Sequence, residues 1–141
     1  IDTPNLAIGY SYVMGPDGTG GRWVNNLFKH VIKGGSAGGG FSTTPDLLRF
    51  DQSLRSGQLV SSEMLNTLWT PKPASPNYGY GFQLSGTPGD RIVGHGGGFP
   101  GISSELDMYL DTAVTFIAMC NYDDAAVLAD RKCRELLARV K

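Results

Sequence analysis

Two glycine-rich segments carry the side chains best suited to chemistry. Residues 34–38 have the sequence Gly-Gly-Ser-Ala-Gly, and residues 95–98 have the sequence His-Gly-Gly-Gly. A serine can serve as an acylated nucleophile, and an imidazole can relay a proton or bind a carboxylate or carbonyl group. Glycines leave backbone N–H groups uncovered, and such groups stabilise the oxyanion of an acyl-transfer reaction. These glycine clusters are therefore where a functional site is to be sought.

These segments also fit two motifs of α/β-hydrolase esterases, the G-x-S-x-G nucleophile elbow and the H-G-G-G oxyanion loop. In that fold the oxyanion loop precedes the elbow, whereas here His95 follows Ser36. An elbow also needs a helix directly behind its serine, but Gly38, Gly39 and Gly40 come next. We therefore expect Ser36 to be a hydrogen-bonding loop residue, and the α/β-hydrolase esterase stays a distant alternative.

The elements that position these segments follow from periodicity and turn residues. Four segments with strand character come after residue 77, joined by short turns. Short connections imply antiparallel neighbours, so we expect an α+β fold, an antiparallel β-sheet meander with flanking helices. The strands are expected at residues 78–84, 91–95, 102–110 and 113–121, with turns at residues 85–90, 96–101 and 111–112.

Three helices are expected to flank the sheet. The first begins at Thr44-Pro45-Asp46, with Thr44 as its cap, and ends at Gly57. The second, capped by Ser61 or Ser62, runs to about Trp69 and is ended by Pro71. The third, capped by Asp123 or Asp124, runs to about Val140. The predicted apolar faces are Leu47, Leu48, Phe50 and Leu54 in the first helix and Ala126, Ala129, Cys133, Leu136, Leu137 and Val140 in the third, with Asp130 and Arg134 elsewhere.

The N-terminal part has weaker signals. Residues 6–14 favour a strand, residues 15–21 favour a turn, and residues 23–32 fit either a strand or a helix. His30, in that open segment, is expected to have a structural role. Since no linker or repeat divides the chain, we expect a single partial domain over residues 1–141.

Composition excludes several classes of protein. The 141 residues include 12 basic and 13 acidic side chains, a net charge of −1 that offers no positive field for nucleic acid. The longest apolar run, residues 116–120, is too short for a transmembrane segment. The two cysteines lack metal-site spacing, so neither a metal nor a cofactor is predicted.

Five segments form an ordered set that covers nearly the whole chain. They are residues 36–50 (SAGGGFSTTPDLLRF), 57–61 (GQLVS), 78–82 (YGYGF), 93–97 (VGHGG) and 100–104 (PGISS). In this order they resemble the serine β-lactamase-like superfamily, which includes class C β-lactamases, D-alanyl-D-alanine carboxypeptidases and family VIII esterases. The resemblance implies the C-terminal part of a β-lactamase/transpeptidase-like fold.

The resemblance also implies roles for individual residues. Val93-Gly94-His95-Gly96-Gly97 is similar to the third active-site motif, which is Lys-Thr-Gly in many β-lactamases and His-x-Gly in carboxypeptidase- and esterase-like members. His95 is thereby implied as a catalytic residue that faces the cleft. Gly96, Gly97 and Gly98 are implied to bind substrate through the backbone, with an oxyanion donor near Gly98. The histidine favours peptidase- or esterase-type chemistry on a small amide or ester over β-lactam resistance.

Two family motifs have no match in this sequence. No serine is followed by lysine three residues later, and Tyr10-Ser11-Tyr12 does not fit the second motif, Tyr-x-Asn or Tyr-x-Ser. Both motifs lie upstream in the family, so the resemblance implies a C-terminal portion whose partner is the missing N-terminal part. We expect this portion alone to be inactive. A non-catalytic penicillin-binding-like sensor or binding module is the alternative, and neither the substrate nor the compartment, periplasmic, secreted or cytoplasmic, can be read from the sequence.

Overall fold

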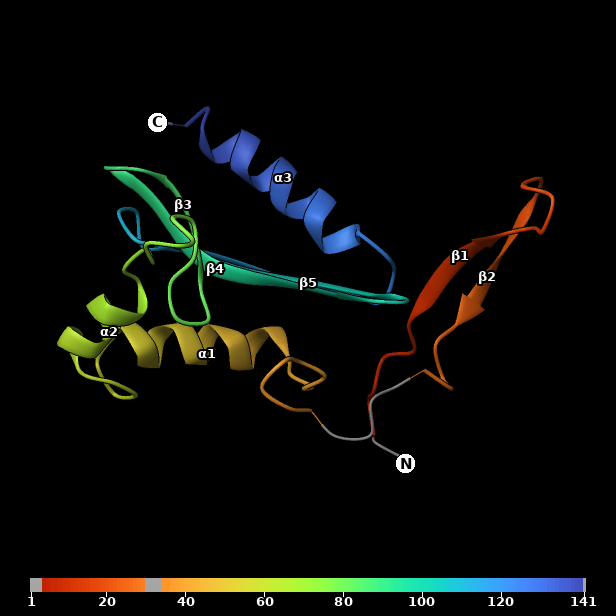
Figure 1. The fold of residues 1–141 in the computed structure, drawn as a ribbon, viewed down its shortest axis with the longest axis horizontal. Coiled ribbons are helices and arrows are strands. Elements are labelled where there is room, and N and C mark those ends of the chain that lie inside the picture. Colours follow the sequence, from red (N-terminus) through yellow and green to blue (C-terminus); the bar gives the residue numbers. More distant parts are fainter. Residues whose placement is uncertain (1–3, 30–33, 141) are drawn as a thin grey trace. The chain divides into compact units, whose positions relative to one another are not determined.

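The computed structural model describes residues 4–29 and 34–140 (Figure 1). The chain divides into two compact units, which we describe separately. Unit 1 contains Ile1–Phe41, Gly97–Ser104 and Ala118–Lys141, and unit 2 contains Ser42–Gly96 and Glu105–Ile117. The single partial domain over residues 1–141 stays a prediction. None of the helices in the described ranges is long and apolar enough to cross a membrane.

A β-hairpin forms the N-terminal part of unit 1. Strand β1 (Tyr10–Met14) pairs antiparallel with β2 (Gly21–Asn25). The connecting turn is closed by the Gly15 N–H, which donates to the Gly20 carbonyl at 2.9 Å. The strand expected over residues 6–14 thus begins only at Tyr10, and residues 23–25 of the ambiguous segment are strand. His30 lies outside the described residues.

The four remaining strands form one sheet in the order β3-β4-β5-β6. They are β3 (Gln83–Thr87), β4 (Asp90–Phe99), β5 (Ile102–Tyr109) and β6 (Val114–Cys120). Sequential neighbours joined by tight connections pair antiparallel, and the predicted antiparallel meander is confirmed.

Two strand boundaries were wrong. The first strand of the meander begins at Gln83, because residues 78–82 form a loop before it. Strand β4 runs to Phe99, so Gly96–Gly98 lie in a strand where the sequence suggested a turn. None of these three glycines has a positive φ; the chain turns instead at Gly101, whose φ is 75°. Glycine clusters mark a turn only where the backbone takes up a conformation that other residues avoid.

Two helices belong to unit 2. Helix α1 (Thr44–Arg55) is capped by Thr43, not Thr44, because the extended Thr43 accepts a hydrogen bond from the Asp46 N–H at 3.3 Å. Its end at Gly57, with φ of 77°, is as predicted. Helix α2 (Ser62–Leu68) is capped by Ser61, which accepts from the Met64 N–H at 3.2 Å.

The apolar core of unit 2 lies between these helices and the sheet. It comprises the buried side chains Leu54, Leu65, Val93 and Met108, with Trp69 and Phe82 among the partly buried residues packed around them. The predicted face of α1 was partly wrong, since Leu48 and Phe50 are 41% and 38% exposed. Asp51 is buried in their place, on the same helix face as Leu54.

Helix α3 (Ala125–Leu137) belongs to unit 1, and its packed face also differs from the prediction. Ala126 and Asp130 are its buried residues, whereas Leu136 is 50% exposed. Asp124 occupies the cap position without a side-chain cap bond. The hydroxyl of Ser103, on β5, accepts the hydrogen bond from the Ala126 N–H at 3.2 Å instead. A residue distant in sequence therefore caps this helix.

Candidate active site

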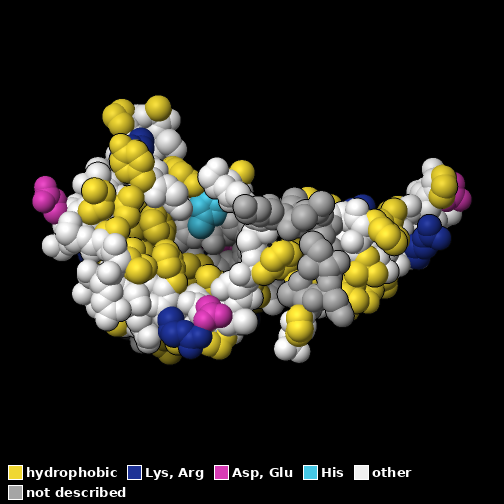
Figure 2. All heavy atoms as spheres, turned by 90° about the horizontal axis from the view of Figure 1, so that it is seen from below, with side chains coloured by type: hydrophobic (Ala, Val, Ile, Leu, Met, Phe, Trp, Pro, Cys, Tyr) yellow, Lys and Arg dark blue, Asp and Glu magenta, His cyan; other side chains and the backbone are white. Residues whose placement is uncertain are grey.

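His95 lies on β4 at the point where the strand leaves the core of unit 2. Ile92, Val93 and Gly94 just before it are buried, and His95 is exposed. Figure 2 shows a histidine side chain, in cyan, on the surface of the molecule. The strand is therefore anchored just before His95, and the side chain of His95 is exposed to solvent.

Strand β3 does not extend alongside His95. It pairs with β4 from Thr87–Asp90 to Gln83–Gly94, so His95 is the first β4 residue beyond the last paired position. The edge of β4 that faces β3 is therefore not paired with β3 from His95 onward. An unpaired strand edge presents backbone N–H and C=O groups that a bound ligand can use.

Tyr78 contacts the imidazole from the loop before β3. Its hydroxyl oxygen is 2.9 Å from His95 Nε2, and the two rings meet edge to face with centroids 5.7 Å apart. The other ring nitrogen, Nδ1, is 2.5 Å from the Gly96 carbonyl oxygen. Sequence reasoning did not assign Tyr78 to the site, although it noted the Tyr-Gly-Tyr-Gly-Phe segment that contains it. Both ring nitrogens of His95 are hydrogen-bonded.

The glycines after His95 differ in what surrounds them. A Cβ on Gly96 would lie 2.4 Å from a carboxylate oxygen of Glu105, and one on Gly97 would lie 3.1 Å from the Ser104 hydroxyl. A Cβ on Gly98 would meet only a carbonyl oxygen 3.9 Å away. Gly96 and Gly97 thus make room for side chains of β5, whereas Gly98 faces open space. Among the three, Gly98 has the backbone most accessible to a ligand.

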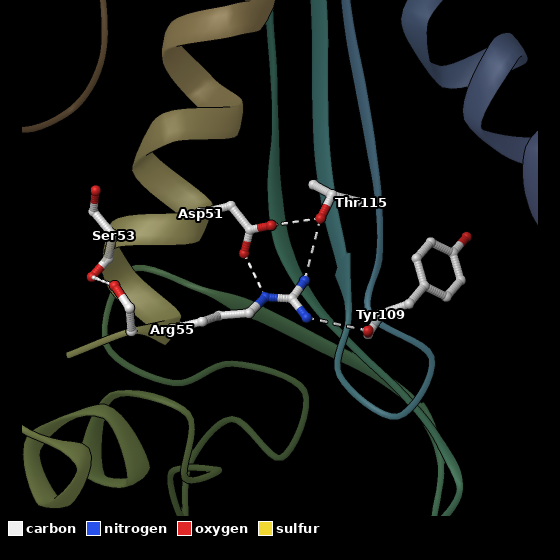
Figure 3. A network of polar contacts seen from close by, with 6 residues as sticks. Asp51, Ser53, Arg55, Tyr109 and Thr115 are labelled. Carbon is white, nitrogen blue, oxygen red and sulfur yellow. Dashed lines mark hydrogen bonds and ion pairs between the residues drawn. The ribbon is translucent and has the colours of Figure 1, made fainter. Parts of the chain in front are cut away.

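A second polar cluster of unit 2 joins α1 to the sheet (Figure 3). The Asp51 carboxylate accepts from Arg55 Nε at 2.5 Å and from the Thr115 hydroxyl at 2.5 Å. Arg55 also donates to Thr115 Oγ1 and to the Tyr109 carbonyl oxygen, each at 3.3 Å. The Asp51 side chain is only 4% exposed. Its oxygens are engaged by these partners, so the cluster holds the helix on the sheet.

Charged pairs at the surface complete the electrostatics of unit 2. Arg91, on β4, donates to Asp111 from its backbone N–H and its guanidinium. These hydrogen bonds, and then the charge of Asp111, raise the pKa of Arg91 above its usual value. No group of three or more metal-binding side chains occurs among the residues that the structure describes. Cys120 and Cys133 are of intermediate exposure.

Ser36 lies in a tight turn and not at a nucleophile elbow. The Gly35 N–H donates to the Gly38 carbonyl at 2.9 Å, and the Gly38 N–H donates back at 3.1 Å, which places Ser36 at the tip. Helix α1 starts only at Thr44. The expectation that this segment is not an elbow is confirmed, and the α/β-hydrolase alternative does not fit an antiparallel meander.

Comparisons with known proteins agree on one family. The family model described as Beta-lactamase matches residues 2–139. Penicillin-binding protein 4* of Bacillus subtilis (strain 168) is 34% identical over 88 residues, which cover 59% of this chain and 20% of that protein.

Two solved structures are similar in fold. A penicillin-binding protein from Bacillus halodurans has a TM-score of 0.81 and 23% identity, covering 96% of this chain and 41% of its own. A D-stereospecific amidohydrolase from Streptomyces sp. has a TM-score of 0.61 and 26% identity, covering 86% and 36%. The chain thus spans less than half the length of each of these relatives. Because the family model matches nearly the whole sequence, the chain belongs to the beta-lactamase family.

Proposed function

We propose that this chain supplies one wall of the active site of a serine hydrolase, which cleaves a small amide or ester through an acyl-serine intermediate. The observation that carries the proposal is the exposed His95 on β4, beyond the end of the β3 pairing and followed by glycine backbone. Membership of the beta-lactamase family supports it, as do relatives described as penicillin-binding proteins and an amidohydrolase.

The residues of this wall have distinct proposed roles. His95 contacts the substrate or the reacting groups as a proton carrier or a hydrogen-bond partner. The backbone N–H near Gly98 donates to the oxyanion, a role that needs a donor about 2.7–3.1 Å from the developing charge. Gly98 suits this role better than its two neighbours, because the space where its side chain would lie is open.

The nucleophile must come from outside these residues. No serine of the 141 has a lysine three residues later, and Ser36 lies at a turn without a base beside it in the sequence. In the proposed enzyme an upstream Ser-x-x-Lys serine attacks the carbonyl, and water then releases the acid.

Hydrolysis assays on this chain test the absence of a nucleophile. We expect it to turn over a p-nitrophenyl ester and a chromogenic β-lactam no faster than its Ser36→Ala variant does. Activity that is lost in Ser36→Ala would instead identify Ser36 as the nucleophile.

The complete reading frame provides the direct test. If it encodes Ser-x-x-Lys upstream, we expect Gly98→Val to lower kcat by about 10²–10³-fold, the usual cost of losing an oxyanion donor. Gly98→Ala is the matched control, because a methyl group covers less of the backbone. Wild-type kcat/KM in both His95→Ala and Gly98→Val would contradict the proposed site.

A non-catalytic penicillin-binding-like sensor or binding module is the second candidate. The motifs that distinguish it from the hydrolase, Ser-x-x-Lys and Tyr-x-Asn or Tyr-x-Ser, lie upstream in the family, and this sequence holds neither. The two candidates separate cleanly, because a sensor without the upstream serine cannot form an acyl-enzyme. Mass spectrometry of the complete protein after incubation with a β-lactam measures that adduct.

A further inference from the structure

We infer that Tyr78 is a positioning residue that holds His95 in the tautomer with its proton on Nδ1. The inference deepens the proposed function, on which its significance for catalysis rests. Its structural basis is independent of that function, since it depends only on hydrogen bonds within unit 2.

The tautomer follows from the partners of the two ring nitrogens. A carbonyl oxygen can only accept a hydrogen bond, so the contact of 2.5 Å between Nδ1 and the Gly96 oxygen requires the proton on Nδ1. A neutral imidazole then has a bare lone pair on Nε2. The Tyr78 hydroxyl, 2.9 Å away, is therefore the donor and Nε2 the acceptor.

The loop around Tyr78 is itself fixed by backbone contacts. The Tyr78 N–H donates to the Ser75 carbonyl at 3.1 Å, and its carbonyl accepts from the Lys72 N–H at 3.2 Å. At the next residue, Gly79, a Cβ would lie 2.1 Å from the Leu68 carbonyl oxygen, so only glycine allows this approach to the end of α2. The hydroxyl is thus presented to His95 by an anchored backbone.

This arrangement affects what the site can offer a substrate. With Nδ1–H bound to Gly96 and Nε2 bound to Tyr78, the plane of the imidazole is fixed from both sides. The Tyr78 oxygen keeps lone pairs that can accept a hydrogen bond while it donates to Nε2. If a substrate group transfers a proton to Tyr78 Oη, the original hydroxyl proton of Tyr78 can move to His95 Nε2. The tyrosine then stays neutral and His95 becomes an imidazolium.

Nitrogen NMR of the imidazole tests the inference on this chain directly. The ¹⁵N-labelled protein carries His30→Gln, so that only His95 contributes ring signals, and the spectra are recorded at mildly alkaline pH. We expect a protonated Nδ1 and an unprotonated, hydrogen-bonded Nε2. In Tyr78→Phe the Nε2–H tautomer should gain population, so the averaged Nε2 resonance should move upfield and the Nδ1 resonance downfield.

Tyr80→Phe is the matched control, since it removes a hydroxyl two residues away in the same loop and should leave the ring signals unchanged. A wild-type imidazole protonated mainly on Nε2 would overturn the inference, even if Tyr78→Phe failed to fold. Unchanged ring signals in a Tyr78→Phe variant with a native amide spectrum would also overturn the inference. Failure of the proposed function would be seen in a different experiment. The complete protein would show no hydrolysis and no acylation, while His95 kept its Nδ1–H tautomer.

Discussion

The two polar clusters of unit 2 use similar chemical groups in opposite surroundings. In the first, the Asp51 carboxylate is buried and bound by Arg55 and Thr115 (Figure 3). In the second, Tyr78 and His95 meet at the surface. A buried ion pair is costly to break because the remaining charge stays out of water, whereas an exposed pair can lose a partner at little cost. The comparison teaches that burial separates a structural polar cluster from one available to a ligand.

Removing the carboxylate of the buried cluster should have the largest effect. We expect Asp51→Ala to lower the free energy of unfolding by about 3 kcal/mol, because Arg55 keeps its charge at a site with 23% exposure. Urea denaturation measures the loss. Asp46→Ala is the control, since its ion pair with Arg49 lies at the surface and should matter much less. Equal losses in the two variants would contradict the contrast between buried and exposed pairs.

The second-largest loss of stability is expected from adding a side chain at Gly94, the residue before His95 in β4. In Gly94→Ala the new Cβ would lie 1.9 Å from the Leu106 carbonyl oxygen, so the strands must separate locally. We expect a loss of about 2 kcal/mol in the free energy of unfolding. The same substitution at Gly98 meets nothing closer than 3.9 Å and should change stability by less than about 0.5 kcal/mol. A stable Gly94→Ala variant would mean that β4 and β5 are not this close.

Truncating the imidazole should barely change stability. His95 is exposed, so we expect His95→Ala to shift the free energy of unfolding by less than about 0.5 kcal/mol. In the complete protein, if it is the proposed hydrolase, the same variant should reduce kcat/KM, although less than loss of the nucleophile. Thermal melts and steady-state kinetics on the same preparation separate the two effects. A large stability loss would place His95 with the buried cluster as a structural residue.

The smallest expected effect concerns the cap of α1. Hydrogen bonds from Thr43, and then from Arg49, hold the pKa of Asp46 below its usual 3.8. A depressed carboxylate pKa in the folded state stabilises the protein above the unfolded pKa, and that contribution is lost as the pH falls through the folded value. Asp46→Asn should therefore be less stable than wild type at about pH 7 and match it at about pH 2. A difference independent of pH would mean that the carboxylate charge is not responsible.

Local signals in the sequence predicted the order of elements well. The meander follows from short connections, since two strands joined by a tight turn pair antiparallel whatever surrounds them. The end of α1 at Gly57 was predicted because a helix end there needs a residue that tolerates positive φ. The sequence leaves the cap of α2 open between Ser61 and Ser62, and the structure has Ser61 as the cap, which accepts from the Met64 N–H.

Features that depend on distant partners were missed. Asp51 was not assigned to a buried helix face, because a carboxylate is buried only where partners such as Thr115 are supplied by another element. Asp130, expected away from the apolar stripe, is likewise on the packed side of α3. For the site, the sequence predicted His95 and the glycines but could not show that Tyr78, from the loop before β3, reaches Nε2.

The capping of α3 by Ser103 has a consequence for the order of folding. Helix α3 has 13 residues, and helices of that length are only marginally stable alone in water. Because Asp124 provides no side-chain cap, the first turn of α3 gains its hydroxyl acceptor only when β5 has brought Ser103 beside Ala126. The last helix of the chain is therefore expected to form late, on a strand hairpin that is already assembled, and not to nucleate folding.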